Sequence, residues 1–321
     1  MKNYLLLFFL AFGSYHVESQ NINTELYEYV KNSPENNDDE AVISYLQKGG
    51  KNQKEQAELI AYWIMENVSY DIEAYTSGNY QSSNWDVTFY SKKGVCAGYA
   101  NLFKELCERL HIECLVVSGY AKGYSYDPNV HFTESNHAWN IVIIGDDHYL
   151  FDVTWASGYA TEMFGELEYI KFPKTAHLFA SPEEFVEKHL PSQRRWQLLD
   201  HPISLDQFEK FSTYEEMQGL NPDLYNYNDS IDGYLKLDFI DRRLKDVEEN
   251  LIVNPDDQGI PIDYEHIAHA YSQNHINQTF LQLSKHYYQI AKSKYMQIED
   301  KKRCDYMIDY VNFYLDRLNG E

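Results

Sequence analysis

The chain has 321 residues, of which 44% are apolar, so it is long enough for two modest domains or for one domain with an appendage. Its formal net charge is −23, and we expect no nucleic acid partner because such a surface repels phosphates. Tyrosine occurs 29 times, and its apolar ring with a polar tip suits half-buried surfaces and grooves.

The N-terminus has the pattern of an export signal. Lys2 supplies the positive start, and the apolar run 4–12 is too short to span a bilayer. The small residues Val17 and Ser19 predict cleavage between Ser19 and Gln20, which makes residues 1–19 a signal peptide. We therefore expect a secreted or periplasmic protein with no membrane span. The alternative interpretation is a buried first helix.

The segments that follow alternate between polar and periodic sequence. Residues 20–52 predict a loosely ordered polar lead-in with one short helix near residues 41–47. Residues 53–68 predict an amphipathic helix, because apolar residues recur every three to four positions. Residues 75–90 have no period and are interpreted as a loop.

A second helix and three strands come next. Residues 96–110 place apolar side chains on one helical face, and residues 114–120 are rich in Val and Leu. Residues 137–144 and 149–155 predict two further strands joined by a turn at residues 145–146. A helix followed by strands predicts an α+β layer in which an antiparallel sheet packs on the helix that carries Cys96.

The second half of the chain divides in two. After residue 155 the sequence is irregular, with a short helix expected at residues 182–189. From about residue 232 three amphipathic faces indicate an all-α C-terminal domain. The expected organisation is a core at 53–204, a linker at 205–231 and a helical domain at 232–321. This domain is a candidate site for a protein partner or a cover for the groove.

Four cysteines occur, at positions 96, 107, 114 and 304, without the spacing of a zinc knuckle. A Cys107–Cys114 disulfide is one possibility in an exported protein. Cys96 falls in the first turn of its predicted helix, where the helix dipole favours a thiolate, the nucleophilic form of the side chain. Taken alone, Cys96 is better interpreted as a structural cysteine.

The predicted hairpin brings His137 and Asp152 close to each other. A two-residue turn pairs Ile144 with Asp147, and counting outward pairs Trp139 with Asp152. His137 and Asp152 then become diagonal neighbours on one face, within reach of each other. An imidazole held in this way by a carboxylate can offer its other nitrogen to a thiol, as acyl transfer requires. A slip of one residue would separate them.

Three motifs in this order resemble the transglutaminase-like superfamily. They are KGVCAGYA at residues 93–100, NHAWN at 136–140 and FDVTW at 151–155. Upstream, Trp63-Ile64 and NVSYD at residues 67–71 also fit. Downstream segments resemble the kyphoscoliosis-peptidase and cytokinesis-protein branch: PEEF at 182–185, HLP at 189–191 and WQLL at 196–199. The resemblance covers roughly residues 55–200 and leaves residues 205–321 without a counterpart.

The resemblance implies a papain-like transglutaminase core with Cys96 as nucleophile, His137 as base and Asp152 as the residue that orients the base. The backbone N–H of Cys96 is a candidate oxyanion donor. Further candidates for the oxyanion site or the substrate groove are Trp85, Tyr70 and Trp139. We expect no metal and no other cofactor, since no acidic loop has calcium-binding spacing.

The expected chemistry is thiol acyl transfer on a peptide or protein substrate. Cys96 attacks an amide carbonyl, an amine leaves with a proton from His137, and a thioester remains. Water then completes hydrolysis or deamidation, whereas a lysine amine would complete a cross-link. By resemblance, a cysteine peptidase or glutamine amidase is preferred. The alternative is a catalytically silent module that binds a peptide or cell-wall ligand in the same groove.

Overall fold

The computed structural model describes residues 22–34, 38–79, 83–218 and 224–320. The expected signal segment at residues 1–19 lies outside these ranges. Among the helices of the described ranges, none combines the length and the apolar character needed to cross a membrane.

A five-stranded antiparallel sheet forms the centre of the molecule, in the order β8-β5-β4-β3-β9. Two of its strands confirm predicted ones almost residue for residue, and Ile144 pairs with Asp147 as expected from the turn. Gly145 has φ = 64°, the left-handed conformation that a tight hairpin turn requires. The strands are β3 (Glu113–Ala121), β4 (His137–Ile144), β5 (Asp147–Phe151), β8 (Leu178–Ala180) and β9 (His189–Pro191).

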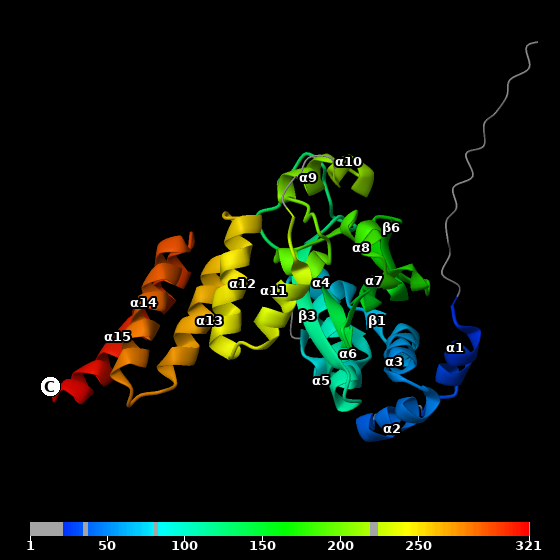
Figure 1. The fold of residues 1–321 in the computed structure, drawn as a ribbon, viewed down its shortest axis with the longest axis horizontal. Coiled ribbons are helices and arrows are strands. Elements are labelled where there is room, and N and C mark those ends of the chain that lie inside the picture. Colours follow the sequence, from blue (N-terminus) through cyan, green and yellow to red (C-terminus); the bar gives the residue numbers. More distant parts are fainter. Residues whose placement is uncertain (1–21, 35–37, 80–82, 219–223, 321) are drawn as a thin grey trace, which may run out of the picture.

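Two buried helices pack on this sheet, α3 (Gln53–Asn67) and α6 (Cys96–Arg109) (Figure 1). Asn52 caps α3 by accepting the N–H of Glu55, which fixes the start of that helix. The buried Asn140 of β4 donates to the carbonyl oxygen of Ala100 at 3.0 Å and so ties α6 to the sheet. The structure therefore confirms an α+β core with the Cys96 helix on an antiparallel sheet.

The segment before α3 is more ordered than expected. Helices α1 (Thr24–Lys31) and α2 (Asp39–Gly49) bury Leu26, Val42 and Leu46 in the same cluster as α3. The expectation of a loose lead-in with one short helix is wrong for the described residues. Their apolar residues are few, but they share one face of each helix, and that face packs on the core.

The predicted loop at residues 75–90 is also wrong within the described residues. It contains the end of α4 (Ile72–Ser77) and most of α5 (Trp85–Ser91). A short parallel pair, β1 (Ser69–Tyr70) with β2 (Lys93–Gly94), brings Tyr70 beside the residues that precede Cys96.

The chain after β5 departs most from the sequence-based expectation. The predicted strand 149–155 ends at Phe151, and α7 (Val153–Ser157) begins directly after Asp152. A hairpin of β6 (Gly158–Met163) and β7 (Glu166–Lys171) follows, where irregular chain was expected. The short helix at residues 182–189 is confirmed in part as α8 (Pro182–Val186), after which His189 begins β9.

The described chain after residue 232 is helical, as predicted, and α12 to α15 lie side by side as an arm at one end of the molecule (Figure 1). The segment 205–231, expected to be a linker, also contains helices in its described part, namely α9, α10 and the start of α11. The predicted apolar face of α15 is confirmed, because Cys304 and Val311 are buried. In α14 the buried face is shifted: Leu281 is buried, whereas Phe280 is 37% exposed. The helices are α9 (Leu205–Lys210), α10 (Tyr214–Gln218), α11 (Tyr227–Leu235), α12 (Phe239–Val253), α13 (Ile260–Ser272), α14 (Gln278–Lys294) and α15 (Ile298–Asn319).

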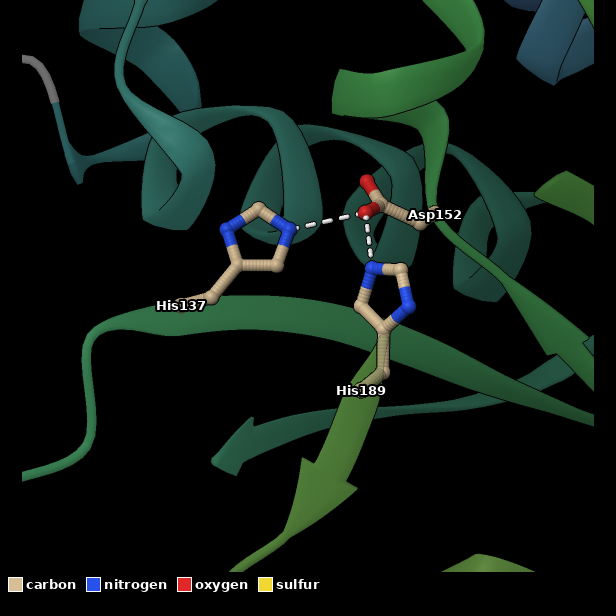
Figure 2. A group of neighbouring side chains, drawn as sticks. All are labelled: His137, Asp152 and His189. Carbon is tan, nitrogen blue, oxygen red and sulfur yellow. Dashed lines mark hydrogen bonds and ion pairs between the residues drawn. The ribbon is translucent and has the colours of Figure 1, made fainter. Parts of the chain in front are cut away.

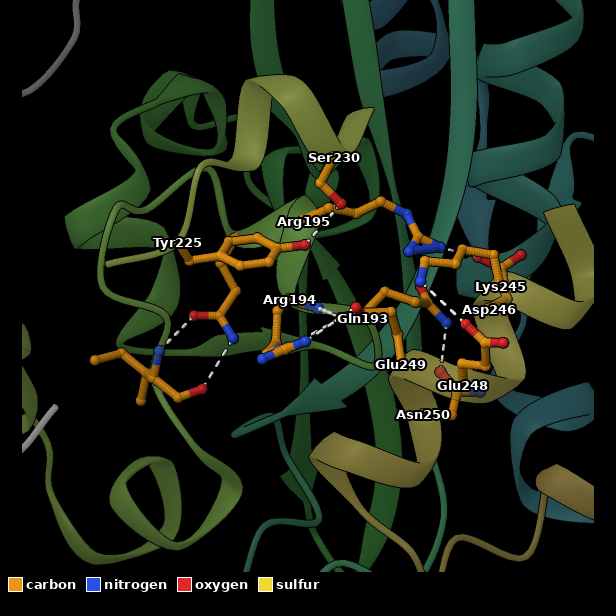
Figure 3. A network of polar contacts seen from close by, with 12 residues as sticks. Gln193, Arg194, Arg195, Tyr225, Ser230, Lys245, Asp246, Glu248, Glu249 and Asn250 are labelled. Carbon is orange, nitrogen blue, oxygen red and sulfur yellow. Dashed lines mark hydrogen bonds and ion pairs between the residues drawn. The ribbon is translucent and has the colours of Figure 1, made fainter. Parts of the chain in front are cut away.

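Charged side chains join this arm to the core (Figure 3). Arg194 makes a two-pronged contact with Glu249 of α12, with N···O distances of 3.0 and 3.1 Å. Arg195, which is completely buried, pairs with Asp246 of the same helix and lies 4.2 Å from the ring centre of Tyr234. The proposed domain boundaries stay predictions, but α12 contacts the core directly.

Candidate active site

Cys96 is the first residue of α6, two positions after the end of β2. Backbone N–H groups without helical partners surround this position, and the helix dipole favours negative charge there. The Cys96 side chain is partly exposed, and none of the four cysteines forms a disulfide. Burial acts to raise the pKa of its thiol, whereas the neighbouring imidazole of His137 and the backbone N–H of Ala138 act to lower it.

His137 opens β4, opposite Gly119 of β3. The residue just before it, Asn136, is held by two hydrogen bonds to the backbone of Ala121, at 2.7 and 3.1 Å. The Nε2 atom of His137 lies 2.7 Å from Oδ2 of Asp152, which leaves Nδ1 for Cys96 (Figure 2). The structure thus brings together the three residues singled out from the sequence.

Asp152 reaches His137 by a route that differs from the predicted hairpin diagonal. It is the N-cap of α7, and its Oδ1 accepts the N–H of Trp155 at 3.0 Å. Its own N–H donates to the carbonyl oxygen of His177 at 2.8 Å. The last ladder pair is Asn140 with Phe151, so the expected pairing of Trp139 with Asp152 does not occur. A helix cap, rather than strand register, aims this carboxylate.

Burial and mutual contact set the protonation states of Cys96, His137 and Asp152. Burial raises the pKa of Cys96, but the hydrogen bond and the charge of His137 outweigh it and hold that pKa below its ordinary value. Burial lowers the pKa of His137, yet the Asp152 carboxylate raises it to about 10. Burial alone would raise the pKa of Asp152, but the two histidines beside it hold it well below its usual range. The arrangement favours a thiolate–imidazolium pair beside a carboxylate.

A fourth residue, His189, belongs to the site, although it is not among the predicted site residues. The Nε2 atom of His189 lies 3.0 Å from the same Oδ2 of Asp152, and the ring is 1% exposed (Figure 2). In the sequence, His189 is notable only as the first residue of the HLP motif at residues 189–191. Since β9 is far from β4 in the sequence, no local pattern could have placed this ring beside Asp152.

His137, Asp152 and His189 also form a cluster that could hold a metal ion. Their N···O distances of 2.7 and 3.0 Å are those of hydrogen bonds. Two nitrogen or oxygen ligands of a tetrahedral zinc ion keep about 3.3 Å from each other. The observed N···O distances therefore fit hydrogen bonds between these side chains better than coordination of a metal ion.

A cavity of about 350 Å³ borders the site at His137. Cys96 is not among the residues that line it, so the cavity meets the imidazole rather than the sulfur. Aromatic side chains make up much of its wall, namely Tyr70, Tyr75, Tyr124, Trp155, Tyr159 and Tyr169. No carboxylate side chain from the described part of the chain is included in the lining, although the chain as a whole is strongly acidic.

The three groove candidates fall in different places. Tyr70 lines the cavity, with its ring 6.0 Å from that of Tyr75. Trp85 begins α5 and packs, partly buried, against the core instead of lining the cavity. Trp139 is 1% exposed and lies under the site, with its ring 5.9 Å from His137. Trp85 and Trp139 are therefore not cavity-lining residues.

The fold and this Cys–His–Asp geometry define a transglutaminase-like domain. Residues 40–153 match the family model of the transglutaminase-like superfamily, so the chain carries a domain of that superfamily. This confirms the family that the three motifs resemble.

Among curated proteins, the chain is similar to kyphoscoliosis peptidase of Mus musculus, with 32% identity over 181 residues, 56% of this chain and 27% of that protein. The human kyphoscoliosis peptidase is 33% identical over 172 residues, 53% of this chain and 26% of that protein. Hillarin of Drosophila melanogaster is 31% identical over 121 residues, 35% and 15% of the two chains. The chain thus spans about a quarter or less of these relatives, which fit the expected branch.

A solved structure titled "Crystal structure of a TGase" aligns with 44% of this chain and 35% of that chain, with a TM-score of 0.29 and 14% sequence identity.

Proposed function

We propose that the protein is a thiol acyl-transfer enzyme of the cysteine peptidase or amidase type, acting on peptide or glutamine amides. The observation that carries this proposal is the contact chain from Cys96 through His137 to Asp152. A nucleophile, a base and a group that orients the base are the parts that acyl transfer needs. The name of the kyphoscoliosis peptidases, which share this region, agrees with the proposal.

Each residue has a defined part in the proposed reaction. The Cys96 thiolate attacks the amide carbonyl carbon, and the carbon–sulfur bond forms as the carbonyl becomes an oxyanion. The backbone N–H of Cys96, at the start of α6, is placed to donate to that oxyanion. The carbon–nitrogen bond then breaks, and the amine leaves with the proton of His137. Water, deprotonated by His137, hydrolyses the thioester and frees Cys96.

Asp152 keeps its charge throughout this cycle. It is fully buried and accepts hydrogen bonds at both oxygens, so it holds the His137 ring with Nε2 toward the carboxylate and Nδ1 toward sulfur. The aromatic cavity beside His137 is the proposed site for the substrate chain on either side of the amide. The helical arm stays a candidate site for a protein partner.

We also propose export of the protein, on the basis of Lys2 and the apolar run 4–12. Residues 1–19 fused to a reporter should direct it out of the cell, with cleavage after Ser19 read by N-terminal sequencing. Retention of the reporter inside the cell would refute this part alone.

The test of the enzymatic proposal is incubation of the wild type and of Cys96→Ala with a peptide library, followed by mass spectrometry. We expect cleaved or deamidated peptides only with the wild type. Because Cys107, Cys114 and Cys304 are buried, the loss of reactivity can be assigned to Cys96. Peptides that are retained by both proteins without any mass change would instead favour the silent binding module.

A further inference from the structure

His189 occupies an unusual place for a buried histidine. It begins β9 and pairs with Ala121 of β3, two positions beyond the pairing of Gly119 with His137. Its Nε2 atom contacts Oδ2 of Asp152, the oxygen that His137 also contacts. Figure 2 shows the two rings approaching this oxygen from different strands.

The surroundings of His189 determine which of its nitrogens carries the proton. Its ring stacks on Phe185 with the ring centres 4.1 Å apart, and Trp155 lies 4.3 Å away. Its Nδ1 is buried and has no hydrogen-bond partner among the described residues. A neutral ring with the proton on Nε2 satisfies the contact with the carboxylate, and the opposite tautomer would set a bare nitrogen against an anion.

Burial in this apolar cage also keeps the ring neutral. It lowers the pKa of His189 to about 4, although the negative charge of Asp152 acts in the opposite direction. At neutral pH His189 is therefore a hydrogen-bond donor without charge. The cation in contact with Asp152 is His137 alone.

We propose that His189 is a positioning residue for the acyl-transfer reaction, whose Nε2–H holds the Asp152 carboxylate in the orientation that His137 requires. This inference rests on the proposed function. Asp152 accepts three protein hydrogen bonds, from Trp155, His137 and His189. The Trp155 N–H fixes one oxygen, and His189 contacts the other oxygen from a different strand than His137 (Figure 2).

The loss of this donor has a defined consequence. A fully buried carboxylate that loses one of its donors is poorly solvated and can rotate toward another partner. Rotation about its side-chain torsions would move Oδ2 away from His137, and the His137 ring would lose the restraint that aims Nδ1 at Cys96. Cys96 would then be less readily converted to a thiolate, although it makes no contact with His189 itself.

Three substitutions separate positioning from packing. His189→Gln keeps an N–H donor four bonds from Cα, as Nε2 is, whereas His189→Asn carries its donor one bond closer, at the place of Nδ1. His189→Phe keeps a ring that can stack on Phe185 but has no donor. If the side chain only filled space, His189→Phe would be the mildest of the three changes. If the Nε2–H orients Asp152, His189→Gln is the mildest.

The experiment measures the rate at which iodoacetamide alkylates Cys96 in the full chain between pH 5 and 11, and the hydrolysis of any peptide that the wild type cleaves. We expect His189→Phe and His189→Asn to slow both reactions about 10- to 100-fold, the range that a hydrogen bond to a charged group is worth. His189→Gln should recover most of the rate. Thermal unfolding shows whether each variant is folded at the temperature of the assay.

The outcomes distinguish this inference from the proposed function. An alkylation profile of His189→Phe that overlays the wild type, or an His189→Gln variant as slow as His189→Asn while both are folded, overturns the role of His189. A wild type whose Cys96 is activated but that cleaves no peptide overturns the proposed function and leaves the role of His189 measurable by alkylation. A wild-type Cys96 that reacts like a free thiol contradicts both.

Discussion

Asn254, the C-cap residue that follows α12, donates a hydrogen bond at 3.0 Å to the carbonyl oxygen of Phe132, five residues before His137. The adjacent carbonyl of Thr133 accepts the backbone N–H of Gln258 at 2.9 Å. The C-terminal arm thus holds the loop between β3 and β4, whose ends carry cavity-lining residues such as Lys122 and Asn136. The arm is therefore connected to the site through hydrogen bonds to this loop.

Replacement of Asn254 by Ala should loosen this loop. The hydrogen bond between Asn254 and the carbonyl of Phe132 would be lost, and we expect a loss of about 0.5–1.5 kcal/mol in the free energy of unfolding. Faster hydrogen exchange across residues 122–136 and slower alkylation of Cys96 should accompany it. The matched control is Gln258→Ala, because the exposed Gln258 contacts the loop through its backbone only. Equal hydrogen-exchange rates of the loop in both variants would refute this connection between the arm and the site.

The pH dependence of Cys96 should report its pairing with His137. As the pH falls below the lowered pKa of Cys96, the thiolate is protonated and peptide turnover declines. As the pH rises through about 10, His137 loses the proton that the leaving amine needs, and turnover declines again. We expect a bell-shaped profile for turnover, and alkylation by iodoacetamide with a midpoint below the ordinary thiol value of about 8.5.

His137→Gln supplies the control for this profile. Without the imidazolium, burial dominates and should raise the pKa of Cys96 above its ordinary value. An alkylation midpoint that is the same in His137→Gln and in the wild type would show that His137 does not activate the thiol.

Acid should destabilise the protein in part through His189. The folded-state pKa of His189 is about 4, below the ordinary value of about 6.5, so the unfolded state binds more protons between these values. Stability is therefore lost as the pH falls from 6.5 to 4, by at most about 3 kcal/mol from this ring. The titratable groups around it are Asp152, His137 and His177.

Chemical denaturation of the wild type and of His189→Phe at pH 6.5 and pH 4.5 measures this effect. The wild type should lose more stability than the variant, because Phe cannot be protonated. Parallel losses in the two proteins would mean that His189 is not held neutral.

Gly119 lies on β3 between β4 and β9, where the close approach of the neighbouring strands leaves no space for a side chain. A Cβ atom there would lie 2.2 Å from the carbonyl oxygen of Leu190 and 2.6 Å from the ring of Trp139. Gly119→Ala should destabilise the fold by about 1–3 kcal/mol and disturb the strand pair that begins with His137. In Gly233→Ala the new methyl meets no atom within 4 Å, and this helical position should become more stable by about 0.5–1 kcal/mol. Thermal unfolding of both variants checks the contrast.

Arg195 tests how the arm is attached. Its guanidinium is fully buried, pairs with Asp246, and leaves Nε and Nη1 without a partner among the described residues. Arg195→Met should cost about 3–5 kcal/mol, because Asp246 is left charged and largely buried. The double variant with Asp246→Leu should recover most of this loss, since removal of both charges leaves no unpaired ion. Denaturant unfolding measures both, and a double variant no better than the single one would contradict this account.

Local patterns were sufficient for several elements. The apolar spacing at residues 53–68 and 96–110 predicted α3 and α6 to within one residue, because an amphipathic helix has its period in the sequence itself. The strands β3 and β4 followed from Val- and Ile-rich runs, and the turn at Gly145 fixed the register of the hairpin. The same reasoning failed after Phe151, where Asp152 caps a helix in place of continuing a strand.

The sequence by itself determined which three residues to examine, since the motifs around Cys96, His137 and Asp152 are each contiguous and occur in a fixed order. Only the tertiary structure decided how they meet: through an N-cap at Asp152 and a fourth residue, His189, from a strand 37 positions away. Helix periodicity and motif order are short-range properties of a chain. The surroundings of a buried carboxylate are set by strands that are distant in sequence, and they exist only once the sheet has formed.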